Sequence, residues 1–150
     1  MNLKNYFDKA LTYESYVKEL GNNLSLHQLH YNKFSLAEKQ ANEIAKMNGY
    51  NLLVLTESWC GDSLASLPVL KKISEAGNGW NLKLLLRDQN LELMDKFLTN
   101  GARSIPLFLF LDHNGNLLFM WGPRTRAAQQ IFENNRPMIR AGKVKKEHVL

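Results

Sequence analysis

The sequence predicts a single α/β domain in which helices flank a mixed four-stranded sheet. Two observations carry this prediction. Apolar runs of strand length alternate with helical patterns after residue 50, and an Asn-Gly turn separates the last two runs. A length of 150 residues fits one compact domain. We expect a helical N-terminal extension at 1–48, the core at 49–136 and a basic tail at 137–150.

Two helices are predicted in the N-terminal extension. Aromatic and aliphatic side chains recur at helical spacing over 6–20, where a glycine ends the pattern. A second helix is predicted over 35–47, because Ser35 and Glu38 form a Ser-x-x-Glu capping box. The segment 24–34 between them is ambiguous.

Three apolar runs predict buried strands, at 51–56, 81–87 and 106–112. Strands that are covered on both faces have such continuous apolar runs. A helix over 62–75, interrupted by Pro68, separates the first two runs. The strand-helix-strand order predicts a right-handed crossover between parallel strands.

The third run is followed by a hairpin. Residues 113–116 read His-Asn-Gly-Asn, and Asn-Gly readily takes the positive φ angles of a tight turn. The returning antiparallel strand is expected at 117–121. A short helix is predicted over 91–99 and a final amphipathic helix over 124–134.

Composition excludes several classes of protein. With one cysteine, the chain can form neither an internal disulfide nor a multi-cysteine metal site. His27 and His30 lack a third ligand at suggestive spacing, so we expect no metal. No apolar run approaches the ~20 residues of a membrane span, and residues 1–10 lack the apolar centre of a secretory signal. We therefore expect a cytoplasmic protein.

The net charge of +5 includes a cluster of basic side chains at 136–146. No aromatic side chains alternate with these charges, as they do on nucleic-acid platforms. We interpret the cluster as a solvated end of the chain and expect neither a nucleic-acid nor a membrane partner.

Chemistry is concentrated in the segment 57–63, which reads Glu-Ser-Trp-Cys-Gly-Asp-Ser between a predicted strand and a helix. The unpaired N–H groups and the dipole of the helix start favour the thiolate of Cys60, which is the nucleophilic form. Ser63, three residues later, can donate a hydrogen bond to the sulfur. The alternative is a buried, inert thiol.

The neighbours of the cysteine have roles of their own. Gly61 allows a tight turn beside the sulfur, and Trp59 can cover one side as part of a binding surface. Asp62 suits the helix dipole but opposes formation of the thiolate, and the sequence does not decide between these effects.

Over 51–134 the sequence resembles the thioredoxin family. The segment Trp59–Ser63 is similar to the family's Trp-Cys-Gly-Pro-Cys active site, and Pro68 matches the proline in the helix that follows it. Ile105 and Pro106 are similar to the family's Ile-Pro pair, whose cis-proline lies against the sulfur. The resemblance implies a thioredoxin fold with a substrate groove beside Trp59.

Three departures limit what this resemblance implies. Ser63 replaces the second cysteine of the family, Asp62 replaces the proline, and Val54 replaces a buried carboxylate that acts in proton transfer. A dithiol reductase needs its second thiol to resolve the mixed disulfide. This chain can therefore form a mixed disulfide but cannot resolve it alone.

The resemblance thus implies a possible monothiol thiol–disulfide oxidoreductase. Cys60 attacks a protein disulfide or a glutathionylated cysteine, and an external thiol such as glutathione, as co-substrate, releases it; no other cofactor is expected. The alternative is a non-catalytic module that binds peptide or protein between Trp59, Ile105 and Pro106. A third reading is a peroxidase or oxidation sensor assisted by Arg103, which also offers a charge for an anionic thiol.

Overall fold

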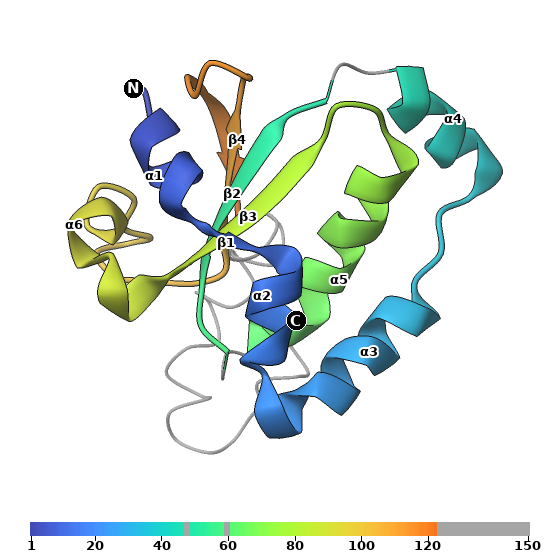
Figure 1. The fold of residues 1–150 in the computed structure, drawn as a ribbon, viewed down its shortest axis with the longest axis horizontal. Coiled ribbons are helices and arrows are strands. Elements are labelled where there is room, and N and C mark those ends of the chain that lie inside the picture. Colours follow the sequence, from blue (N-terminus) through green and yellow to red (C-terminus); the bar gives the residue numbers. More distant parts are fainter. Residues whose placement is uncertain (47–48, 59–60, 123–150) are drawn as a thin grey trace.

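A computed structural model describes residues 1–46, 49–58 and 61–122, with the backbone alone for 61–65 (Figure 1). The helices are α1 (Lys4–Lys9), α2 (Tyr13–Lys18), α3 (Leu24–Lys33), α4 (Glu38–Lys46), α5 (Gly61–Ala76) and α6 (Leu91–Met94), with 3₁₀ turns η1 (Gly21–Asn23) and η2 (Arg87–Gln89). The strands are β1 (Leu11–Thr12), β2 (Asn51–Thr56), β3 (Asn81–Leu86), β4 (Leu107–Leu111) and β5 (Leu117–Trp121). The helix predicted over 124–134 and the basic tail lie outside the described residues.

One mixed sheet has the strand order β1-β3-β2-β4-β5. β2 and β3 are parallel, and β4 lies antiparallel to β2 with Leu55 opposite Leu107. β5 returns antiparallel to β4 through the predicted hairpin, in which Gly115 has a φ of 90°. The predicted α/β class is confirmed, and the sheet has one more strand than expected.

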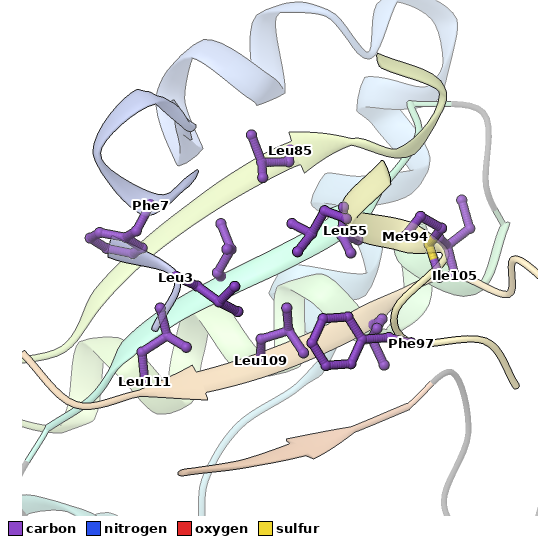
Figure 2. Packing of buried hydrophobic residues seen from close by; sticks show 12 residues of the cluster. Leu3, Phe7, Leu55, Leu85, Met94, Phe97, Ile105, Leu109 and Leu111 are labelled. Carbon is purple, nitrogen blue, oxygen red and sulfur yellow. The ribbon is translucent and has the colours of Figure 1, made fainter. Parts of the chain in front are cut away.

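Helices cover both faces of this sheet. α1 and α6 lie on one face, and α2, α3 and α5 lie on the other (Figure 1). Leu53 and Leu55 of β2 belong to the apolar cluster under α1 and α6, which Figure 2 shows, while Leu52 and Val54 belong to the opposite cluster. This alternation is that of a strand buried on both faces, where each leucine contributes roughly 1.5–3 kcal/mol.

The prediction of one helix over 6–20 is wrong. The chain forms α1, then crosses the sheet edge as β1, where Leu11 pairs with Leu84 of β3, and then forms α2. The physical reason is that Phe7 packs on one face of the sheet and Tyr16 on the other, so a continuous helix cannot serve both. The Thr12 hydroxyl caps α2 by accepting from the Ser15 N–H at 3.1 Å.

The second predicted helix begins later than expected. α4 starts at Glu38, and the side chain of Gln40 accepts from the N–H of Ala37 at 3.1 Å. This bond is half of a capping box centred on Ala37, so Ser35 is not the capping residue. The ambiguous segment before it is helical, as α3.

Two further helices differ from the prediction. α5 is continuous through Pro68, because Leu67 and Leu70 beside it are buried and offset the missing hydrogen bond. α6 ends at Met94, well short of residue 99. The N–H of Phe97 donates to the Met94 carbonyl at 3.0 Å, a tighter turn that places the Phe97 ring in the core.

Candidate functional site

The predicted strand and helix are present before and after the cysteine. β2 ends at Thr56, the chain continues through Glu57 and Ser58, and α5 begins at Gly61. Trp59 and Cys60 lie outside the described residues. The helix starts one residue after the cysteine, so its first-turn N–H groups belong to the segment that carries the sole thiol of the chain.

Asp62 and Ser63 lie in the first turn of α5, where the description covers only their backbone. A carboxylate in the first turn of a helix is favoured by the helix dipole. Ser63 is three positions after Cys60 in the sequence and lies one turn or less from the start of the helix. Its hydrogen bond to the sulfur stays a prediction.

Ile105 and Pro106 lie at the same end of the sheet. Both are buried, the peptide bond between them is cis, and they lead directly into β4. Because Leu55 pairs with Leu107 in antiparallel register, the residues before Leu107 continue alongside the residues after Leu55. The fold thus brings the Ile-Pro pair next to the strand end that leads to Cys60.

Two side chains of the N-terminal extension reach this strand end. The Tyr16 hydroxyl donates to the Glu57 carbonyl at 3.2 Å, and the Asn23 Nδ2 donates to the Ser58 carbonyl at 3.0 Å. Sequence reasoning missed both residues. Their partners lie 41 and 35 positions away, and no local pattern signals such a contact.

Glu57 is a third residue to which sequence reasoning gave no role. Only 8% of its surface is exposed, and its Oε2 accepts from the backbone N–H of Asp88 at 2.9 Å. This bond ties the end of β2 to η2, which follows β3. The available signal was an acidic residue placed directly after a continuous apolar strand.

The position of the family's buried carboxylate is apolar here. Val54 is fully buried and lies between Leu84 of β3 and Phe108 of β4. Val54 cannot accept a proton, and its cross-strand partners Leu84 and Phe108 are apolar as well. Proton transfer by the family's usual route is therefore absent at residue 54.

Arg103 is engaged in a bidentate ion pair. Its Nε and Nη2 donate to the two carboxylate oxygens of Asp95 at 2.7 and 3.0 Å, and its carbonyl accepts from Arg87 Nη1 at 3.0 Å. The hydrogen bond with Asp95 raises the pKa of Arg103, and the same bond lowers the pKa of Asp95. Because Asp95 balances its charge, the argument that Arg103 recruits an anionic thiol or stabilises peroxide is weakened.

His27, the first histidine of the predicted pair, takes part in packing between helices. His27 is buried, and a hydrogen bond joins its Nε2 to the hydroxyl of Tyr13 between α3 and α2. Among the described residues, no three His, Cys, Asp or Glu side chains are grouped to hold a metal ion. Within the same part of the chain, no helix is long and apolar enough to cross a membrane.

Comparisons with known proteins agree with this geometry. Two similar solved structures are a protein of unknown function from Pseudomonas aeruginosa and an HIV epitope-scaffold, with TM-scores of 0.76 and 0.77. Each is 20% identical to this chain, and the alignments cover 95% of this chain and 89% and 90% of theirs. At that identity they show the fold alone. No curated protein matches the sequence.

A family model described as Thioredoxin matches residues 10–137. The match includes the strand-to-helix junction around Cys60, the Ile105-Pro106 pair and most of the N-terminal extension. Together with a sheet in which the cysteine follows a central strand, it establishes that the chain belongs to the thioredoxin family.

Proposed function

We propose that this protein is a monothiol thioredoxin-like protein that forms mixed disulfides through Cys60. The supporting observation is the position of that cysteine in the chain, between the end of β2 and the first residue of the 16-residue helix α5. Unpaired N–H groups at a helix start favour negative charge and lower the pKa of a thiol there. The thiolate would then be populated at neutral pH.

The reaction is a pair of thiol–disulfide exchanges. The Cys60 thiolate attacks one sulfur of a disulfide R–S–S–R′, forms Cys60–S–S–R and releases R′–S⁻, which takes up a proton. An external thiolate then attacks the sulfur of R, forms a new disulfide with it and releases the Cys60 thiolate. R′ leaves as a thiol, R leaves in a disulfide with the external thiol, and Cys60 is regenerated. When R and the external thiol are both glutathione, the products are a reduced protein cysteine and glutathione disulfide. With a protein disulfide, a second external thiol attacks the remaining mixed disulfide and frees R as a thiol.

The other residues of the site would bind the substrate and orient the thiolate. The Ser63 hydroxyl or N–H would donate to the thiolate, and Ile105 and Pro106 would form one wall of the groove. Trp59 would form the other wall, with Gly61 and Asp62 at its base. An extended substrate can pair with exposed backbone in such a groove, as in strand addition.

The substrates would be protein disulfides or glutathionylated cysteines. Glutathione would act as the co-substrate that releases the mixed disulfide. This chemistry needs a compartment that keeps glutathione reduced, such as the cytoplasm.

The test is the pH dependence of Cys60 alkylation, read by mass spectrometry because the chain has a single thiol. We expect half-maximal reaction well below the value of about 8.5 for a free thiol, and a glutathione adduct after exposure to glutathione disulfide. Ser63→Ala would move the midpoint toward the free-thiol value. An ordinary midpoint and no adduct would reject the proposal.

A non-catalytic binding module is the second candidate. Val54 favours it, because a valine in an apolar cluster cannot assist proton transfer. Cys60→Ser discriminates between the two candidates. Peptide or protein binding that survives this substitution, without a mixed disulfide in the unsubstituted protein, would support the module.

A further inference from the structure

We infer that the N-terminal extension positions the active-site segment, with Tyr16 and Asn23 as positioning residues for Cys60. The two side chains hold the carbonyl groups of Glu57 and Ser58, the last described residues before the cysteine. This inference rests on the proposed function, because the position of the segment matters through the reactivity of the thiol.

Tyr16 is a rigid anchor. It is fully buried in α2, and its ring belongs to the apolar cluster that includes Val54, Leu67 and Phe108. Dense packing fixes the ring, and the ring fixes the direction of its hydroxyl. The hydroxyl donates to the Glu57 carbonyl at 3.2 Å, directly beyond the end of β2.

Asn23 is held in place by a backbone hydrogen bond within η1. It is the last residue of η1, its N–H donates to the Leu20 carbonyl at 2.9 Å, and Leu20 is buried in the same cluster as Tyr16. Its Nδ2 donates to the Ser58 carbonyl at 3.0 Å. Ser58 is two residues before Cys60, so this bond acts on the chain immediately ahead of the thiol.

A third bond completes the anchoring of this segment. The Glu57 carboxylate accepts from the Asp88 N–H at 2.9 Å, so residues 57–58 are held from α2, η1 and η2 together. Beyond the cysteine, Gly61 begins α5, which is fixed by the buried Leu67 and Leu70.

Only Trp59 and Cys60 connect these two fixed points. Consecutive Cα atoms are about 3.8 Å apart, so the position of Ser58 limits where the cysteine two residues later can lie. The effect of a helix start on charge falls off within one turn. A loosened Ser58 would therefore weaken the stabilisation of the thiolate and slow its reaction.

The experiment compares two deletions at the anchor with two matched deletions elsewhere. Tyr16→Phe removes the anchoring hydroxyl, and its control, Tyr31→Phe, removes a hydroxyl that donates to Glu75 at 2.7 Å near the far end of α5. Asn23→Ala removes the anchoring amide. Its control, Asn2→Ala, removes an amide that donates to the Asn114 carbonyl at 3.0 Å in the hairpin.

The readouts are the pH profile of Cys60 alkylation and the native-state hydrogen exchange of the amides at 57–61. We expect both anchor variants to lower the alkylation rate at neutral pH by about threefold to tenfold, the range for loss of one hydrogen bond. The midpoint should rise and exchange at 57–61 should speed up. Both controls should keep the original profile and exchange.

The outcomes separate this inference from the proposed function. Equal changes in anchor and control variants, or unchanged exchange at 57–61 in the anchor variants, would overturn the positioning role. If the unsubstituted protein has an ordinary thiol midpoint and forms no glutathione adduct, the proposed function fails, and the exchange comparison alone then decides whether the extension holds the segment.

Discussion

Gly122 packs against the carbonyl oxygen of Pro106, so closely that a Cβ at residue 122 would lie 2.6 Å from that oxygen. Gly122 follows β5 and Pro106 precedes β4, so the contact joins the strand end beside the active-site segment to the neighbouring edge strand. Gly122 also has a φ of 107°, which residues with a side chain rarely adopt. Both the space and the backbone require glycine there.

Gly122→Ala should therefore lower the free energy of unfolding and displace Pro106. Gly101→Ala is the matched control, because Gly101 has a φ of 79° but nothing within 4 Å of its Cβ position. The control should cost about 1–2 kcal/mol, for the backbone alone. Gly122→Ala should cost about 1–3 kcal/mol more, for the clash. Urea unfolding measures both, and equal losses would contradict the clash.

The core of this fold is predictable from the sequence because its signals are local. The strands β2, β3, β4 and β5 fall within a residue of their predicted bounds. β2 and β4 are buried along almost their whole length and are therefore continuous apolar runs, while β5 is partly exposed and was predicted as the returning strand of the hairpin. The Asn114-Gly115 turn was predictable for the same reason, because its chemistry fixes its backbone.

The N-terminal extension was not predictable in this way. Whether Phe7 and Tyr16 share a helix depends on which sheet face each one covers, and that choice is made by the tertiary structure. The bonds from Tyr16 and Asn23 to the active-site segment, and the pairing of Arg103 with Asp95, likewise join residues without any shared local pattern. The residue types of the site could be predicted from the sequence, but the long-range contacts that hold them in place could not.

Stability should fall as the pH drops through the range in which an exposed histidine titrates. Burial lowers the pKa of His27 in the folded protein, and the neighbouring His30 lowers it further. The unfolded chain binds a proton near pH 6.5, before the folded protein does, so stability is full above that value and declines below it. Urea unfolding between about pH 5 and about pH 8 measures the decline.

His27→Gln should flatten this pH dependence, because it removes the group that titrates. Asp95 and Asp112 do not contribute in this range, because hydrogen bonds lower their pKa values from 3.8. His30→Gln should keep the dependence but reduce it. A slope that persists unchanged in His27→Gln would assign the effect to another group.

Tyr13→Phe should destabilise the protein by about 1–3 kcal/mol, because it leaves the buried Nε2 of His27 without its hydrogen bond. The effect should depend on His27. In a double-mutant cycle with His27→Leu, the double variant should therefore lose less stability than the sum of the two single losses. Additive losses would show that the loss in Tyr13→Phe does not come from the hydrogen bond to His27.

Ser63→Cys should convert the proposed monothiol chemistry into dithiol chemistry. Residue 63 lies in the first turn of α5, three positions after Cys60 in the sequence. At a helix start we expect Cα atoms three residues apart to fall within the 4.4–6.8 Å range of disulfides. On oxidation this variant should lose two thiols without gaining a glutathione adduct, because the new thiol resolves the mixed disulfide. Thiol titration and intact mass measure both changes.

Ser66→Cys is the matched control for this gain of function. It adds a thiol to the same helix, but six positions from Cys60, which corresponds to about 9 Å of helix rise and lies beyond the reach of a disulfide. The control should therefore accumulate the glutathione adduct on Cys60 as the unsubstituted protein does. If Ser63→Cys also accumulates the adduct and closes no internal disulfide, then residue 63 does not face the sulfur, and the hydrogen bond proposed from Ser63 to the thiolate is wrong as well.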